Sequence, residues 1–181
     1  MIFLFLLKLT YFLIPGAFAN MIPVFVKKLN FFNYPLDFRM NFFGERLFGA
    51  NKTFRGLFFG IGIAIILLFF QQILYNYRFF KNLSLIDYSM VNFLLFGFLT
   101  GFGVLVGDLI GSFLKRRLYV APGKSLLIVD QINGGFGLAI FIVPVYFKSL
   151  IFAIWIILAW TIGHFILKYL GYLLKLYKEK I

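Results

Sequence analysis

The chain has 181 residues, of which 62% are hydrophobic and only 13% are charged, and its formal net charge is +12. A soluble domain is usually about half apolar and about a quarter charged. The composition therefore excludes an ordinary water-soluble domain and predicts a polytopic, all-α integral membrane protein. In such a protein the positive charge indicates membrane topology and anionic partners at the bilayer surface, and we expect no nucleic acid partner.

Five segments are long and apolar enough to be predicted as membrane spans, since a spanning helix needs about 20 mostly apolar residues. They are residues 2–26, 57–75, 89–110, 132–147 and 150–170. The first contains "GAFAN", which resembles a signal-peptide cleavage site, but no basic n-region precedes it and the apolar run continues beyond it. We therefore expect a retained first helix. With no repeat or linker visible, we expect residues 1–181 to form a single membrane-embedded domain.

The cations predict the orientation of the chain in the membrane. With five spans, the first loop, the third loop and the C-terminal tail share one side, and most cations lie there. They are Lys27, Lys28, Arg39, Arg46, Lys52, Arg55, Lys115, Arg116, Arg117, Lys124, Lys168, Lys175, Lys178 and Lys180. The positive-inside rule then predicts an outside N-terminus and a cytoplasmic C-terminus. The tail, residues 168–180, is expected to extend the last helix along the anionic headgroups.

The third span carries two four-residue glycine series, Gly97–Gly101 and Gly103–Gly107–Gly111. Small residues at this spacing let helix backbones approach closely, so close helix packing is one interpretation. The other is that the glycines leave room for a phosphate or metal beside Asp108. The two interpretations are compatible.

Asp108 stands near the cytoplasmic end of this span, and ionisable groups at membrane depth usually face a partner or a wet cavity. If the helix continues past Gly111, then Asp108, Ser112 and Lys115 share one face. One interpretation is an intramembrane ion pair between Asp108 and a cation such as Lys115. The loop, however, carries more cations than carboxylates, which leaves positive charge for an anion.

The first cytoplasmic loop ends in "RLFGANKTFRG", which leads directly into the second span, with Asn51 or Thr53 as the expected N-cap. Cations at a helix N-terminus oppose the macrodipole, so Lys52 and Arg55 are unfavourably placed unless an anion binds there. A phosphate would fit, because free N–H groups, a hydroxyl and cations converge on it. The alternative is that these cations are only cytoplasmic flanking charges.

A third polar segment, "PGKSLLIVDQINGG", brings Lys124 and Asp130 to the mouth of the fourth span. Two carboxylates, Asp108 and Asp130, suit a hard divalent cation such as Mg²⁺, which is held by oxygen ligands together with substrate phosphates. The one histidine, His164, lies in the last span and is expected to be a packed helix residue. Three polar segments are thus predicted to meet at one membrane face.

These three segments resemble the motifs of the CDP-archaeol synthases and, more distantly, of the CDP-diacylglycerol synthases. "RLFGANKTFRG" is similar to the family pattern R-x-x-G-x-x-K-T-[WF]-R-G, and "GDLIGSFLKRR" and "PGKSLLIVDQIN" follow in the family's order. The resemblance implies an Mg²⁺-dependent membrane cytidylyltransferase. Such an enzyme couples CTP to a digeranylgeranylglyceryl phosphate, forming CDP-lipid and pyrophosphate in phospholipid biosynthesis at the cytoplasmic face of the cell membrane.

Carried over residue by residue, the resemblance implies catalytic roles for Asp108, Asp130 and Lys115, with Mg²⁺ held by the two aspartates. The implied nucleotide and phosphate ligands are Asn51, Lys52, Thr53, Arg55, Ser112, Lys115, Arg116 and Lys124. Asn133 stands where the family pattern usually ends in an aspartate, so a weakened or shifted metal site is expected there. Arg117 is interpreted as a flanking charge.

Three other functions are compatible with parts of this pattern. The first is a CDP-diacylglycerol synthase acting on diacyl phosphatidic acid, because composition does not distinguish ether from ester lipids. The second is a CDP-alcohol phosphatidyltransferase, but its D-G-x-x-A-R motif is absent from the chain. The third is a non-enzymatic lipid transporter, for which mid-membrane helix breaks and inverted repeats are expected.

Overall fold

The computed structural model describes residues 2–121 and 124–173. Within this part of the chain, five helical segments are long and apolar enough to cross a membrane, which confirms the predicted all-α membrane fold. Many large apolar side chains of these helices lie on the outside of the bundle and are exposed, including Ile66, Phe70 and Ile154. Such a surface suits lipid, whereas a soluble protein would rarely expose so large an apolar area.

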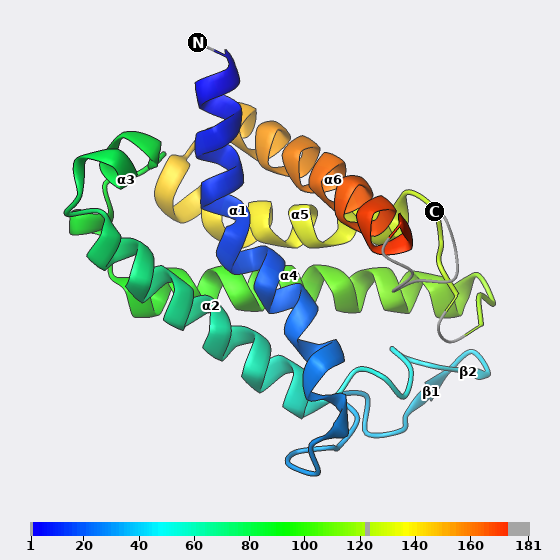
Figure 1. Cartoon of the computed structure of the whole chain (residues 1–181). Helices are drawn as coiled ribbons and strands as arrows, with labels where there is room; N and C mark the ends of the chain where they lie inside the picture. The colour runs from blue at the N-terminus through cyan, green and yellow to red at the C-terminus, as the bar shows by residue number, and fades with distance from the viewer. Residues whose placement is uncertain (1, 122–123, 174–181) are drawn as a thin grey trace.

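Four of the five spans are long helices, the fourth span in chain order is shorter, and small elements connect them (Figure 1). Their bounds are α1 Ile2–Phe25, η1 Val26–Lys28, β1 Asn41–Phe42, β2 Glu45–Arg46, α2 Phe54–Leu74, α3 Arg78–Leu83, η2 Tyr88–Met90, α4 Phe93–Arg117, α5 Val129–Ile142, the π-helical turn η3 Val143–Phe147, and α6 Leu150–Leu173. Where the bounds differ from the predicted spans, they do so by one to seven residues, and α2 begins at Phe54, three residues before the predicted start. The third span begins at Phe93 and continues to Arg117, and the fourth begins at Val129.

Helix starts follow local sequence. Asn92 caps α4 by accepting hydrogen bonds from the backbone N–H groups of Leu94 and Leu95 at 3.0 and 3.2 Å. Thr53 caps α2, since its hydroxyl accepts from the N–H of Gly56 at 3.3 Å. This selects Thr53 over Asn51 as the N-cap. Side-chain caps of this kind satisfy donors that the helix leaves unpaired.

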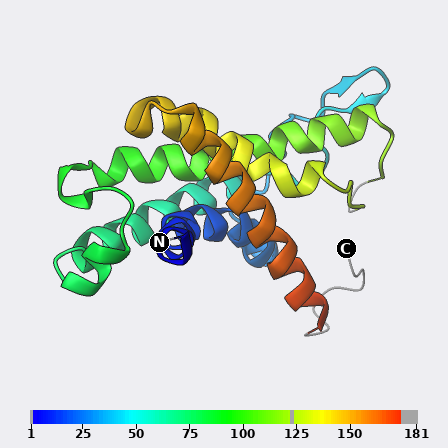
Figure 2. The ribbon, with the colours of Figure 1, turned by 90° about the horizontal axis from the view of Figure 1, so that it is seen from above.

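Helix α4 is the central helix of the bundle. It packs most extensively against α2 on one side and α5 on the other, α1 crosses both α2 and α4, and α6 packs on α5 (Figures 1 and 2). The core is formed by fully buried apolar side chains from several helices, such as Leu9, Phe96, Val104, Leu138 and Ile156.

The two predicted glycine series of α4 face different neighbours. A methyl group added at Gly97 would lie 2.6 Å from the Cα of Ile65, and one at Gly101 would lie 2.8 Å from the Cα of Ile61, so this series admits α2. The second series faces α5, where a methyl group at Gly103 would lie 2.9 Å from the carbonyl oxygen of Gly137. Close helix packing is therefore confirmed for both series.

Candidate active site at the junction of the first loop, α4 and α5

The second glycine series brings α5 against the C-terminal half of α4. At Gly107 an added methyl group would clash with the backbone carbonyl of Asn133, and at Gly111 it would lie 2.6 Å from the side-chain nitrogen of Asn133. The side of α4 that these glycines open is thus filled by α5, and a phosphate or metal beside Asp108 stays a prediction. The close approach of the two helices holds Asp130, one turn before Asn133, against the same end of α4 that carries Asp108.

Asp108 forms an ion pair with Lys52, whose ammonium donates to the carboxylate. Lys52 lies in the first loop, one residue before the Thr53 cap of α2. About a quarter of each side chain in the pair is exposed to solvent. The first loop and α4 are therefore joined at the carboxylate that the sequence singles out.

Lys115 forms the second ion pair of the site, with Asp130 of α5 at 2.7 Å. The other carboxylate oxygen of Asp130 accepts a hydrogen bond from the backbone N–H of Leu126 at 2.9 Å, which fixes the start of α5. The alternative that Asp108 forms an ion pair is therefore confirmed, but its cation is Lys52 of the first loop and not Lys115. Asp108 and Lys115 share a helix face but each has a partner from a different segment.

Ser112 and Arg116 lie on the buried side of α4, with 3% and 6% of their surfaces exposed. The guanidinium Nε of Arg116 has no hydrogen-bond partner, and Arg116 forms no ion pair with any residue that the structure describes. It lines a cavity of about 320 Å³ together with Phe43, Arg117 and Tyr119. A buried cation without a carboxylate is unstable by itself, so this cavity favours an anion.

Asp37 organises the first loop, a role that sequence reasoning missed. Its side chain is fully buried and pairs with Arg46 at 2.5 Å, and it accepts hydrogen bonds from the backbone N–H groups of Arg39 at 3.0 Å, Phe48 at 3.4 Å and Gly49 at 3.2 Å. Burial alone would raise the pKa of Asp37, but these donors outweigh it and lower the pKa below its ordinary value. Asp37 thus fixes the turn that leads into Lys52.

Arg117 is the second structural residue of this region, and its interpretation as a flanking charge is wrong. Its guanidinium donates to the backbone carbonyls of Phe42, Glu45 and Arg46, so it fastens the β1–β2 hairpin to the end of α4. It also lies over the rings of Phe42 and Phe113, at 5.3 and 5.1 Å from their centroids. No local pattern distinguishes it from Arg116; only the fold separates an anchoring arginine from an unpaired one.

The comparisons with known proteins identify the family of the chain. The family model of CarS-like CDP-archaeol synthases matches residues 1–180. The chain belongs to the CDP-archaeol synthase family. Curated relatives include the CDP-archaeol synthase of Methanococcus maripaludis strain C7, 32% identical over 97% of this chain and 96% of that protein, and that of Pyrococcus furiosus, 39% identical over 70% of this chain and 68% of that protein.

A solved structure also resembles the chain. It is described as an intramembrane enzyme for archaeal membrane lipids biosynthesis, and it aligns with a TM-score of 0.65 at 22% identity over 85% of this chain and 88% of that chain. At this identity the likeness shows the shared fold. The fold of this CDP-archaeol synthase family member is thus one that an experimental structure also displays.

The remaining site residues that the sequence predicted lie at different places in this CDP-archaeol synthase family member. Arg55 is buried and donates to the carbonyl of Leu29, so its described contact holds the first loop onto α2. Asn51 and Lys124 are exposed. Asn133 turns its side-chain oxygen to the N–H of Gly134 at 2.6 Å, and the structure does not bring it to either ion pair as an additional ligand.

His164 of α6 and Gln131 of α5 are two polar residues whose surroundings sequence reasoning missed. His164 lies within electrostatic range of both Asp108 and Asp130 and has a buried Nδ1 without a hydrogen-bond partner. Gln131, next to Asp130, is fully buried, and neither atom of its amide group has a partner. Unpaired buried polar groups are rare in native structures and require an explanation. Of these two residues, His164 is the one that both carboxylates influence electrostatically.

The metal-ligand set within the described residues is small. No three His, Cys, Asp or Glu side chains there are grouped to hold a metal by themselves. Two carboxylates are still compatible with Mg²⁺, because Mg²⁺ is usually bound by one or two carboxylates together with substrate phosphates and water. The donor set therefore fits a metal that arrives with a nucleotide.

Proposed function

We propose that the chain transfers the cytidylyl group of CTP to the phosphate of a glycerol lipid with two ether-linked geranylgeranyl chains, releasing pyrophosphate. One observation carries this proposal. Two carboxylates, Asp108 and Asp130, meet two lysines and one unpaired buried arginine at a single edge of the bundle, in a chain of the CDP-archaeol synthase family. The acceptor class follows from the names of the relatives, which are CDP-archaeol synthases.

In the proposed reaction, an oxygen of the lipid phosphate attacks the α-phosphorus of CTP. A new phosphorus–oxygen bond forms, and the bond between the α-phosphorus and the oxygen that bridges to the β-phosphorus breaks. Catalysis of this kind depends on positioning and on shielding negative charge, so no side-chain nucleophile is needed. The absence of cysteine from the chain is therefore compatible with this reaction.

The lysines are assigned to the phosphates. Lys52 and Lys115 are each paired with a carboxylate, which keeps both ammonium groups oriented at the site. When a triphosphate and a lipid phosphate bind, the lysines exchange their carboxylate partners for phosphate oxygens. Arg116 contributes a guanidinium that needs no exchange, since it forms no ion pair with any of the described residues.

Asp108 and Asp130, freed from the lysines, would hold Mg²⁺ together with the phosphates. When bound, Mg²⁺ supplies Lewis-acid shielding of the phosphate oxygens and of the leaving pyrophosphate. Ser112 is close enough in the helix to contribute a hydroxyl from the same face of α4. Asn133, which packs against Gly111, is assigned a supporting role in the position of α5 beside α4.

The proposed location of the site is the cytoplasmic face of the cell membrane, with the N-terminus outside. The support is the accumulation of cations in the first and third loops, together with the positive-inside rule. The tail residues Lys175, Lys178 and Lys180, which contribute to the predicted asymmetry, lie outside the described residues. A membrane-impermeant amine reagent on intact cells should label Lys148 and leave Lys27 unlabelled, and the reverse pattern would contradict this orientation.

The proposed reaction is tested with purified protein, Mg²⁺, digeranylgeranylglyceryl phosphate and CTP labelled in either the α- or the γ-phosphate. The α-label should enter the lipid fraction and the γ-label should leave as pyrophosphate. Diacyl phosphatidic acid serves as the matched acceptor, and a preference for it would replace the proposed acceptor by that of a CDP-diacylglycerol synthase. Lipid movement without pyrophosphate release would indicate a transporter, and consumption of CDP-lipid without CTP would indicate a phosphatidyltransferase.

A further inference from the structure

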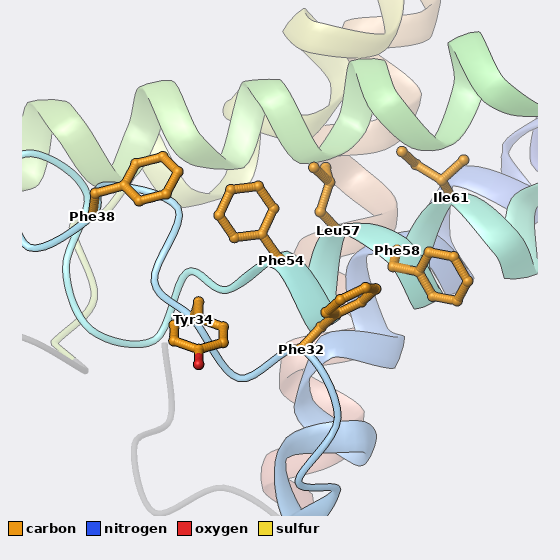
Figure 3. A pocket seen from close by; sticks show the side chains of 7 residues that line it. All are labelled: Phe32, Tyr34, Phe38, Phe54, Leu57, Phe58 and Ile61. Carbon is orange, nitrogen blue, oxygen red and sulfur yellow. The ribbon is translucent and has the colours of Figure 1, made fainter.

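An apolar groove lies beside the site, and the reaction chemistry leaves it unused. It has a volume of about 420 Å³, and we call it the aromatic groove. Its lining residues are Phe32, Tyr34, Phe38, Phe54, Leu57, Phe58 and Ile61. Figure 3 shows that the Tyr34 hydroxyl, the one polar side-chain atom among the seven, points away from the other six side chains. The groove is therefore suited to hydrocarbon.

The wall of the groove is fixed to the segment that carries Lys52. Residues 32–36 lie alongside residues 52–55, with the N–H of Leu36 donating to the carbonyl of Lys52 at 2.8 Å. Phe54 and Arg55 donate their N–H groups to the carbonyls of Tyr34 and Phe32 at 3.0 and 2.8 Å. The guanidinium of Arg55 secures the preceding turn by donating to Leu29. Hydrogen bonds thus fix the part of the groove wall that the first loop contributes.

Two aromatic residues of this wall have unusual backbones. Phe32 and Phe38 have φ angles of +46° and +48°. Bulky residues rarely adopt the left-handed region, and such conformations persist where the surrounding structure holds them. Both side chains line the groove, so the strained positions coincide with its wall.

The polar and apolar parts of this region are adjacent in the chain. Phe54 lies in the middle of the aromatic groove (Figure 3), and Lys52, two residues earlier, contacts Asp108. Two residues of extended chain span about 7 Å at most. From Phe54 the lining continues along α2 through Leu57 and Phe58 to Ile61, that is, into a membrane span. A cationic end followed by an apolar groove directed into the bilayer complements an anionic amphiphile.

We infer that the aromatic groove binds one hydrocarbon chain of the lipid-phosphate substrate, with the phosphate at Lys52 and the chain along the first two turns of α2. The inference rests on the proposed function and adds the residues that select the lipid. Each methylene or methyl group of the lipid chain that contacts these aromatic and branched aliphatic side chains adds to the binding free energy. The groove therefore contributes to the affinity for long-chain acceptors and leaves CTP binding unaffected.

The experiment compares Ile61→Trp, which fills the groove, with Ile66→Trp, which places the same side chain on the exposed surface of α2 further along the span. KM is measured for CTP and for two acceptors, diether phosphates with geranylgeranyl or with geranyl chains. Ile61→Trp should raise the KM of the longer acceptor about tenfold or more, with a smaller effect on the shorter one and none on CTP. Ile66→Trp should match the unmodified protein.

A second variant, Phe58→Ala, removes an exposed part of the groove wall. It tests the inference independently if Ile61→Trp does not fold. It should also raise the KM of the long-chain acceptor while the KM of CTP stays constant. Equal behaviour of Ile61→Trp and Ile66→Trp, or equal changes in both KM values for Phe58→Ala, would overturn the inference and leave the groove as a contact for bulk lipid. Absence of CDP-lipid formation by the unmodified protein would instead refute the proposed function.

Discussion

Arg116 and Arg117 are neighbours in sequence and have opposite relations to the fold. Arg117 donates to three backbone carbonyls through its terminal guanidinium nitrogens, whereas the Arg116 side chain forms no hydrogen bond or ion pair with the residues that the structure describes. Removing a side chain that donates several hydrogen bonds destabilises a protein, but removing an unpaired buried charge does not. The two arginines therefore give a residue-scale test of which cation serves substrate and which serves structure.

We predict that Arg116→Met raises the KM of CTP about tenfold or more, which corresponds to about 1.4 kcal/mol of lost binding, while the melting temperature in detergent stays the same or rises. Arg117→Met should lower the melting temperature because the hairpin loses its anchor to α4. Both quantities are measured on the same purified samples. A lower melting temperature for Arg116→Met with an unchanged KM would contradict the assignment of Arg116 to substrate.

Asp37 gives a pH dependence to the first loop. Its pKa is lowered in the folded protein, since the donors of Arg46, Arg39, Gly49 and Phe48 outweigh the effect of burial. A carboxyl group with a lowered folded pKa stabilises the fold above its unfolded pKa of about 3.9, and this stabilisation is lost as the pH falls through the folded value. The contribution is therefore complete at neutral pH and decreases below about pH 4.

We predict that Asp37→Asn weakens amide protection at Phe48 and Gly49 already at pH 7, as measured by hydrogen exchange with mass spectrometry. In the unmodified protein the same amides should keep their protection down to about pH 4, after correction for the intrinsic exchange rate. The exposed Asp87, changed to Asn, is the matched control and should leave these amides unaffected. Full protection in Asp37→Asn at pH 7 would rule out the organising role.

At the scale of elements, the contact between α4 and α5 decides whether the site exists. Gly103, Gly107 and Gly111 allow α5 to approach until its backbone meets that of α4. This approach puts Asp130 beside the end of α4, where Lys115 reaches it at 2.7 Å. The glycines act on the chemistry indirectly, through the separation of two helices.

We predict that Gly107→Ala lowers stability by about 1–3 kcal/mol, the usual range for overpacking a tight contact, and reduces turnover as Asp130 moves away from Asp108. Gly62→Ala is the matched control, because nothing lies within 4 Å of a methyl group at that position. It should be neutral or stabilising, since alanine is favoured over glycine in helices by up to about 1 kcal/mol. Equal effects of the two substitutions on melting temperature and turnover would contradict the close-contact account.

For the whole molecule, composition and hydropathy predicted most of the fold. Five apolar stretches near 20 residues each leave few alternatives to five spanning helices, and the four-residue spacing of the glycines indicated close packing. The sequence could not assign partners to the two series, because Gly97 and Gly103 lie on helix faces whose neighbours depend on the three-dimensional arrangement. The continuation of the third span past Gly111 was considered and is confirmed, whereas the start of the fourth span at Val129 was missed, since polar residues extend this helix beyond the apolar run.

The site was predicted in outline, by the motifs that contain Lys52, Asp108, Lys115 and Asp130. Which lysine pairs with which aspartate could not be predicted, because Lys115 shares a helix face with Asp108 and only the position of α5 supplies Asp130 as the nearer partner. His164 was missed for the same reason: a single histidine in an apolar helix gives no local signal of its neighbours. Magnesium, the site roles and the single-domain organisation of residues 1–181 stay predictions.

The most direct test of the account is the dependence of CDP-lipid formation on the two carboxylates. Asp108→Asn and Asp130→Asn are assayed with CTP, Mg²⁺ and digeranylgeranylglyceryl phosphate, with Asp87→Asn as the exposed control. We predict that each site variant loses turnover at least about 100-fold, by analogy with the loss of a group that stabilises transition-state charge, and that Asp87→Asn retains full activity. Full turnover in Asp108→Asn or in Asp130→Asn would contradict the account.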